Sequence, residues 1–208
     1  MAQEMRAPAV PAVADPAPLG LAAFALTTFV LSAHNAGLFG TVANTVVVGL
    51  AIFYGGLAQF MAGMWSFRRG NTFTATAFTT YGAFWLSLGT YIVLIIAGKV
   101  KTEDVATSLG WFLLAFLIFN SYMLVWSSRI NTAVFGVFLT LEVTELLLAL
   151  GFFNASDTLI KAGGYMGLVT AFVAWYTSAA DVATAMAGRP ILPVGRVIWV
   201  EKGARRRG

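Results

Sequence analysis

The sequence predicts an all-α membrane protein with six transmembrane helices per protomer and both termini in the cytoplasm. Composition is the first observation: 59% of the 208 residues are apolar and 11% are charged, against about 45–50% and about 25% in soluble domains. A chain of this length cannot bury so much apolar surface in a water-soluble core. The same composition, with no Cys, excludes a disordered chain, a coiled coil and a disulfide-stapled secreted module.

Run length is the second observation. Each apolar run is near the ~20 residues that cross ~30 Å of hydrocarbon, and none has the ten-residue alternation of a membrane β-strand. In chain order the expected spans are residues 19–39, 44–67, 74–97, 109–126, 132–153 and 162–186. Short breaks separate them, at residues 40–41, 68–71, 98–108, 127–131 and 154–161. We therefore expect no large soluble domain at either membrane face.

Charge asymmetry is the third observation. With six spans, the side of the termini holds 10 Lys and Arg residues and the opposite side holds 3, which places the termini in the cytoplasm. The expected organisation is a flexible tail over residues 1–14, a transmembrane domain over 15–188 and a basic cytoplasmic tail over 189–208. A basic tail beside apolar segments favours membrane lipid over nucleic acid as its partner.

Few ionisable residues lie within the spans. Glu142 and Glu145 lie in the fifth expected span, and none of the six spans contains a Lys or Arg that could pair with them. A charged carboxylate at mid-membrane costs on the order of 2.5–3.5 kcal/mol, so each carboxyl is expected to be protonated or to face a wet cavity. Proton handling is one interpretation, and hydrogen bonding between helices or subunits is the other. His34, at the outer end of the first span, could shuttle protons or serve packing.

Enzymatic activity is not expected. Intramembrane hydrolases need a nucleophile with a base, or a metal site with several ligands. The chain has one His, no Cys and neither an HExxH nor a GxSxG motif. We therefore predict no catalytic residue, no metal and no cofactor, which leaves a channel, a transporter or a structural membrane protein.

A dense motif opens the first span. Residues 15–24 read Asp-Pro-Ala-Pro-Leu-Gly-Leu-Ala-Ala-Phe, and this segment resembles the signature of the acetate uptake transporter family, the succinate–acetate permeases and their fungal relatives. The matching motif residues are Asp15, Pro16, Pro18 and Gly20. Asp15 stands where the family usually has Asn, and both residue types cap helix starts.

Further motifs occur in the same order as in the family. They are His34-Asn35-x-Gly37, Tyr54-Gly55-Gly56-x-Ala58-Gln59, Gly70-Asn71-Thr72-Phe73, Thr76-Ala77-Phe78 and Tyr81-Gly82-x-Phe84-Trp85. The likeness is dense over residues 15–87 and looser over 88–195, where it rests on the number of spans and on a few glycine motifs.

The resemblance implies a homohexameric ring in which each protomer has its own path for acetate. It implies a narrow constriction of Phe24, Tyr81 and Leu141, the last placed by counting back from Gly151. Hydroxyls and amides near this path would replace the hydration of the anion. The candidate substrate-binding residues are Thr27, Thr28, Asn35 and Gln59, and the candidate proton-handling residues are Glu145, Glu142 and His34.

The expected function is a transporter or channel for acetate and for other small carboxylates such as succinate, in the inner or plasma membrane of a bacterium or archaeon. Passive anion flow and proton symport both stay open at this point. Two alternatives remain: a membrane scaffold or sensor that keeps the fold without transport, and an ammonium exporter.

Overall fold

The computed structural model describes residues 13–40 and 45–200. Residues 1–12 of the expected N-terminal tail and residues 201–208 of the basic tail lie outside the described residues. The helices are α1 (Ala17–Asn35), α2 (Val46–Ile52), the π-helix η1 (Phe53–Ala58), α3 (Gln59–Arg68), α4 (Thr72–Ile96), α5 (Thr102–Ser127), α6 (Thr132–Phe153) and α7 (Asp157–Ala187).

Six helical stretches of the described chain are long and apolar enough to cross a membrane. α2, η1 and α3 run on from one another without a break and together form the second of these stretches, Val46–Arg68. The remaining stretches are α1, α4, α5, α6 and α7. No strand occurs among the described residues, so the prediction of an all-α fold with six spans is confirmed.

Side-chain caps set three of the helix starts. Asn71 accepts a hydrogen bond from the Thr74 amide at 3.1 Å, and Asn131 accepts one from the Val134 amide at 2.8 Å. The Ser156 hydroxyl accepts from the Leu159 amide at 3.4 Å. Each bond satisfies an amide that has no partner within the first turn of its helix.

Two helices start earlier than their apolar runs. α5 begins at Thr102 rather than at residue 109, and α7 begins at Asp157 rather than at 162. Their first turns are polar and acidic, with Glu103 and Asp104 in α5. Carboxylates stabilise a helix N-terminus, so these turns are helical although they are not apolar. At the end of α1 the chain turns at residues 36–40, and Gly37 has a φ of +80°.

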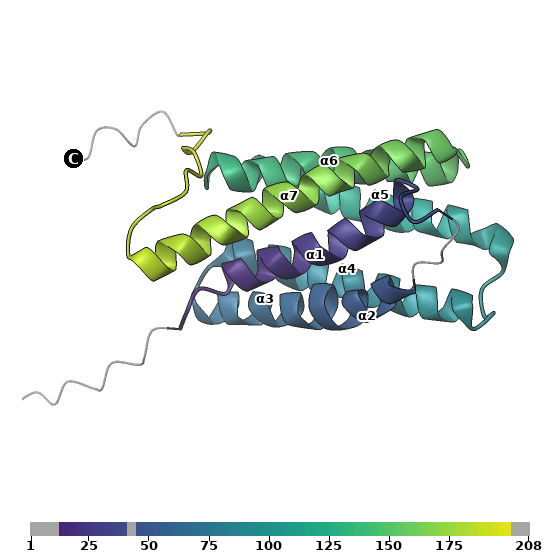
Figure 1. Cartoon of the computed structure of the whole chain (residues 1–208), viewed down its shortest axis with the longest axis horizontal. Coiled ribbons are helices and arrows are strands. Elements are labelled where there is room, and N and C mark those ends of the chain that lie inside the picture. Colours follow the sequence, from purple (N-terminus) through teal and green to yellow (C-terminus); the bar gives the residue numbers. More distant parts are fainter. Residues whose placement is uncertain (1–12, 41–44, 201–208) are drawn as a thin grey trace, which may run out of the picture.

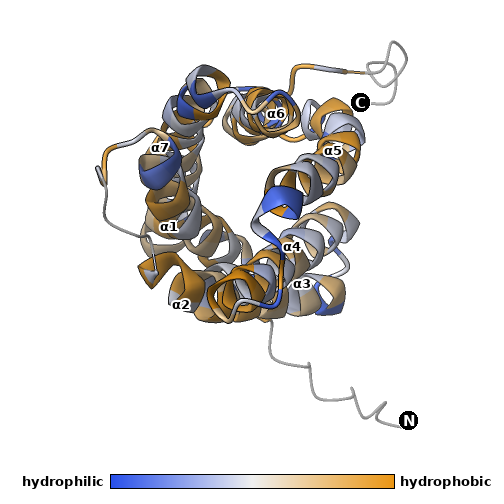
Figure 2. Cartoon of the chain, turned by 90° about the vertical axis from the view of Figure 1, so that its right-hand side faces the viewer, coloured by the Kyte–Doolittle hydropathy of each residue, from blue (hydrophilic) through white to orange (hydrophobic). Residues whose placement is uncertain are grey.

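The helices form a ring in chain order. Viewed from the end opposite the termini, α1 lies between α7 and α2, and the ring continues through α3, α4, α5 and α6 (Figure 2). α1 packs along α7, which closes the ring. The start of α1 and the end of α7 lie at the same end of the bundle (Figure 1). We call this the terminal end, and the other the far end.

Small residues set the closest helix contacts. A Cβ on Gly164 of α7 would collide with the backbone of Ala36 at the end of α1, and one on Gly167 would collide with Ser32 of α1. A Cβ on Gly82 of α4 would lie 2.6 Å from the Phe60 amide nitrogen of α3. Such positions admit only glycine without a shift of a helix, as expected for small-residue contacts between membrane helices.

α4 and α5 meet through large aromatic side chains instead. Phe84 of α4 contacts Phe112 and Phe116 of α5, with ring centroids 5.0 and 4.8 Å apart. Tyr81 of α4 contacts Phe119 of α5 at 5.5 Å. Bulky aromatic side chains hold two helix backbones farther apart than glycine contacts do. The space between α4 and α5 is therefore filled by side chains.

The described part of the basic tail, residues 189–200, lies along the terminal end of the bundle. The Val194 carbonyl accepts from the Ala133 amide at 2.9 Å, and the Pro193 carbonyl accepts from the Tyr176 hydroxyl at 2.7 Å. The indole of Trp199 stacks on that of Trp126 at 5.8 Å. These contacts fasten the segment to α6, α7 and the end of α5.

Candidate functional site

Two cavities enter the bundle from opposite ends. The far cavity has a volume of about 500 Å³ and reaches residues near helix ends at the far end, among them Asn35, Ile96 and Ile160. The terminal cavity has a volume of about 290 Å³ and reaches Asp15 and Asn131 at the terminal end. Together they run along most of the length of the bundle.

Three side chains line both cavities: Phe24 of α1, Tyr81 of α4 and Leu141 of α6. Among the described residues no others do, and we call these three the septum. All are buried, with exposed fractions of 5%, 4% and 6%. The Phe24 and Tyr81 rings meet edge to face at 5.7 Å. The residues that the family resemblance assigns to a constriction therefore lie together between the two cavities.

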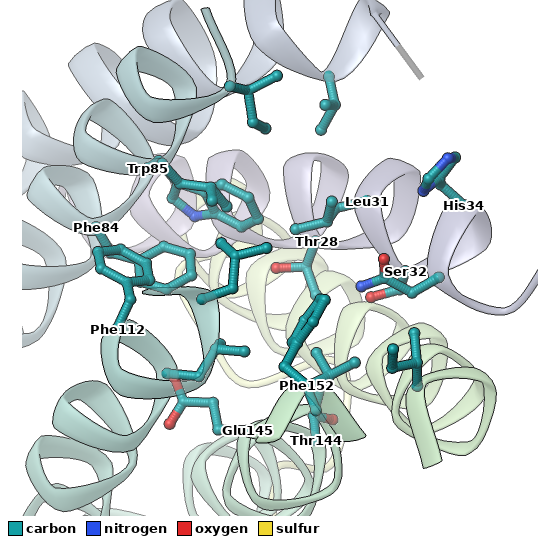
Figure 3. Close-up of a pocket in the computed structure, with 18 of the residues that line it drawn as sticks. Thr28, Leu31, Ser32, His34, Phe84, Trp85, Phe112, Thr144, Glu145 and Phe152 are labelled. Atoms are coloured by element: carbon teal, nitrogen blue, oxygen red, sulfur yellow. The ribbon is translucent and has the colours of Figure 1, made fainter. Parts of the chain in front are cut away.

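The far cavity is mostly apolar, with a few polar groups around it. Thr28, Trp85 and Glu145 reach it from three different helices (Figure 3). The Thr28 hydroxyl, the Trp85 indole nitrogen and the Glu145 Oε2 are buried, and none of the described residues bonds them. Buried polar groups without partners are uncommon in folded proteins, which makes these three atoms candidates for contacting a ligand.

The terminal cavity has one comparable group. Gln59 is 1% exposed, and its Oε1 has no hydrogen-bond partner among the described residues. Asp15 and Asp181 also line this cavity. Asp15 Oδ1 accepts from the Ala17 amide at 3.0 Å, so it serves the start of α1, and its Oδ2 lies 3.5 Å from the Arg69 guanidinium.

The two glutamates belong to a polar cluster that joins α4, α5 and α6. The Tyr81 hydroxyl lies 3.0 Å from Asn120 Oδ1 and 3.3 Å from Glu145 Oε1. The Asn120 amide nitrogen donates to Glu142 Oε2 at 2.6 Å and to the Phe138 carbonyl at 2.9 Å. Glu142 therefore bonds across to α5, as the packing interpretation expects. Glu145 differs, because its side chain lines the far cavity and its buried Oε2 has no hydrogen-bond partner among the described residues.

Other candidate residues lie in different settings. Asn35 and His34 line the far cavity near its outer limit, where His34 is exposed and its ring meets that of Phe39 at 6.0 Å. Thr27 lines neither cavity: its hydroxyl donates to the Ala23 carbonyl at 2.9 Å, and its side chain packs on Gly55. Within the motif that opens α1, Pro16 and Gly20 are buried, and the Pro18 carbonyl accepts from Ser178 of α7 at 2.7 Å.

Asn120 is the main residue that sequence reasoning missed. It is fully buried and contacts both the septum and Glu142. Asn120 does not ionise, so the cost of a charge within the membrane does not point to it. The signal that could have found Asn120 is its amide within an otherwise apolar stretch of the fourth span, since an unpaired amide there is also costly.

Comparisons with known proteins identify the family. The model of the GPR1/FUN34/yaaH family matches residues 1–196. Acetate permease A of Emericella nidulans is 40% identical over 93% of this chain and 70% of its own length. Ammonia transport outward protein 2 of Saccharomyces cerevisiae is 43% identical over 82% of this chain, which spans 62% of the yeast protein.

Bacterial relatives match over almost their full length. The Succinate-acetate/proton symporter SatP of Escherichia coli K12 is 36% identical over 88% of this chain and 96% of its own length. The solved structure of the bacterial acetate channel SatP superposes with a TM-score of 0.83 at 35% identity, covering 88% of this chain and all of that one. The resemblance seen in the motifs is thereby confirmed: this multi-pass membrane protein belongs to the GPR1/FUN34/yaaH family.

Proposed function

We propose that the protein is a membrane transporter or channel for acetate and other small carboxylates such as succinate. The observation that carries the proposal is the pair of cavities that enter from opposite ends and meet at the septum. A path of this form connects the two sides of a membrane through one protomer. The names of the relatives support the same substrate class, because they include an acetate permease, a succinate-acetate/proton symporter and an acetate channel.

The septum is proposed to select by size. Phe24 and Leu141 offer apolar surface to the methyl group of acetate, while the Tyr81 hydroxyl is the polar group of the three. A narrow apolar ring with one hydroxyl passes a small ion that has shed part of its water and rejects bulkier acids.

Polar groups on either side are proposed to replace the lost hydration. Thr28, Trp85 and Asn35 can donate hydrogen bonds to a carboxylate in the far cavity, and Gln59 can do so in the terminal cavity. None of the described residues that line the cavities is Lys or Arg. Binding by neutral donors alone is weak, and weak binding suits conduction because the ion must also leave.

Assembly and location are part of the proposal. We propose a homohexamer in the cell membrane, with its termini in the cytoplasm and one path in each protomer. We propose a transporter rather than an enzyme, and the names of the relatives as permease, symporter and channel support this. Native mass spectrometry from detergent or nanodiscs tests the hexamer, and a monomer as the largest species would contradict it.

The test of the function is uptake into vesicles that contain the purified protein. We expect radiolabelled acetate to enter faster than into protein-free vesicles, and unlabelled succinate to compete. Repeating the assay with an imposed pH gradient separates proton symport, which is accelerated by the gradient, from passive anion flow. Measuring ammonium transport in the same vesicles tests the alternative of an ammonium exporter, which the name of the yeast relative raises. Acetate entry equal to that of protein-free vesicles would contradict the proposal and favour a scaffold or sensor.

A further inference from the structure

The polar cluster of Tyr81, Asn120, Glu142 and Glu145 has a defined hydrogen-bond direction. The Phe138 carbonyl, 2.9 Å from the Asn120 side chain, can only accept a hydrogen bond. The NH₂ group of Asn120 must therefore face Phe138, and its second proton serves Glu142 Oε2. This arrangement turns the Asn120 oxygen toward Tyr81, where it can only accept.

The direction of the Asn120 amide fixes the proton of Tyr81. A tyrosine hydroxyl has one proton to donate, and Asn120 Oδ1 is its nearer partner, at 3.0 Å against 3.3 Å for Glu145 Oε1. With that proton given to Asn120, the Tyr81 oxygen faces Glu145 with a lone pair. Two oxygens at this separation attract each other only if a proton lies between them, and Glu145 must supply it.

The second oxygen of Glu145 supports the same conclusion. Oε2 is buried and has no hydrogen-bond partner among the described residues. An ionised carboxylate oxygen left in that state would carry a large desolvation cost, whereas the carbonyl oxygen of a neutral acid carries much less. Glu145 is 3% exposed, so water cannot freely replace the missing donor.

We propose that Asn120 is a positioning residue that holds Glu145 as a neutral acid beside the septum. It does so by accepting the Tyr81 proton, which leaves the Tyr81 oxygen to accept the proton of Glu145. A neutral acid lets a carboxylate pass the septum, whereas an ionised Glu145 would repel it. The inference deepens the proposed function and rests on its carboxylate path.

The groups around Glu145 are consistent with this role. Glu142 on α6 and Tyr122 on α5 are the other titratable groups near Tyr81 and Glu145, and the Asn120 amide donates a hydrogen bond to Glu142. Tyr81 is the titratable group of α4 that contacts Glu145. Toward the far cavity, α1 presents the hydroxyl of Thr28, and α6 presents Thr144, whose hydroxyl bonds that of Thr170 on α7 at 3.1 Å. His34 lies on α1 at the outer part of the same cavity.

Acetate uptake by four proteins tests the proposal: wild type, Asn120→Leu, Glu145→Gln and the double variant. Leucine has a similar size but cannot accept the Tyr81 proton, so Tyr81 donates to Glu145 and stabilises its charged form. We expect Asn120→Leu to lower uptake at neutral pH roughly tenfold. A factor of this size corresponds to the stabilisation of a charged group by one hydrogen bond, here that of ionised Glu145 by Tyr81. At acidic pH its uptake should approach that of wild type, after subtraction of protein-free vesicles.

The double variant separates positioning from structure. Because Gln cannot ionise, adding Glu145→Gln to Asn120→Leu should restore uptake at neutral pH. Thr177→Val is the matched control: it removes a buried hydroxyl that lines neither cavity and bonds within α7, so its pH profile should match that of wild type. If Asn120→Leu lowers uptake equally at every pH and Glu145→Gln does not restore it, the proposal is wrong.

An infrared measurement tests the inference without transport and without Asn120→Leu. The wild-type protein at neutral pH should show the carbonyl band of a neutral carboxylic acid, and Glu145→Gln should lose that band. Absence of a Glu145 band would overturn the inference while leaving the transport assay to decide the proposed function. A Glu145 band in a protein that moves no acetate would instead overturn the proposed function alone.

Discussion

Leu141 is a septum residue whose side chain can be shortened without breaking a hydrogen bond. Truncation by Leu141→Ala widens the septum on the α6 side, so larger acids should gain most. We expect the ratio of lactate to acetate uptake to rise roughly tenfold. This lies within the ~1–3 kcal/mol by which one methylene changes the discrimination between two substrates in an apolar pocket. Competition between the two acids in vesicles that contain the variant measures the ratio.

A matched control for this truncation is Met123→Ala. Met123 is as buried as Leu141 but lines neither cavity, so its truncation should lower stability without changing the acid preference. An unchanged lactate-to-acetate ratio in a well-folded Leu141→Ala protein would remove Leu141 from the proposed path.

At the residue scale, sequence motifs fixed the positions of two of the three septum residues. Phe24 and Tyr81 lie within family motifs, and both line the two cavities. Thr27 and Thr28 show its limit: neighbouring helix positions differ by 100°, and only packing decides which hydroxyl faces the cavity. The amide of Asn120 is a local signal of a costly residue in the fourth span, but its partners on α4 and α6 cannot be identified from one sequence.

At the element scale, hydropathy found the spans but not all of their ends. It missed the polar first turns of α5 and α7, because a helix can extend beyond the hydrocarbon where its caps and acidic residues support it. The π-helix η1 also went unpredicted. A π turn inserts one extra residue and rotates the side chains of the next helical turns about the axis. Within η1, Gly55 packs against Thr27 of α1, where a Cβ would collide with the threonine side chain.

Close glycine contacts give a prediction for the α3–α4 interface. In Gly82→Ala, the new Cβ would lie 2.6 Å from the Phe60 amide nitrogen, and backbone cannot move aside as a side chain can. The helices must separate, at a cost of about 1–3 kcal/mol for an overpacked contact. We expect a lower unfolding temperature in detergent, monitored by light scattering or tryptophan fluorescence.

Gly136→Ala is the comparison for that substitution. Its Cβ would lie 3.5 Å from the Val173 side chain, an ordinary contact distance. Alanine also favours a helix over glycine by about 1 kcal/mol, so this variant should unfold at or above the wild-type temperature. Equal unfolding temperatures for the two variants would show that α3 and α4 tolerate separation.

At the scale of the whole molecule, the number of spans and their order along the chain could be predicted, but the ring could not. Short breaks predict that consecutive helices are neighbours, and the structure shows this arrangement (Figure 2). Closure requires α1 to pack on α7, a contact between the two ends of the chain that no local pattern specifies. The two cavities arise from this closure, so they could not be derived from composition or periodicity.

The orientation of the whole molecule in the membrane is the last prediction. Of the 13 Lys and Arg residues, 10 belong to the side of the termini, and positive charge favours the cytoplasmic side. The chain has no Cys, so an introduced thiol is the only one available for labelling. Ala14→Cys lies at the terminal end and Leu38→Cys at the far end, where Leu38 is 58% exposed.

Intact cells that produce each cysteine variant are treated with a membrane-impermeant maleimide. We expect labelling of Leu38→Cys and none of Ala14→Cys until the membrane is permeabilised, after which both should react. The cysteine-free chain controls for labelling of other proteins. Labelling of Ala14→Cys alone in intact cells would reverse the orientation. It would place the far cavity on the cytoplasmic side, so that acetate entering the cell would meet the terminal cavity, lined by Gln59 and Asp181, before the septum.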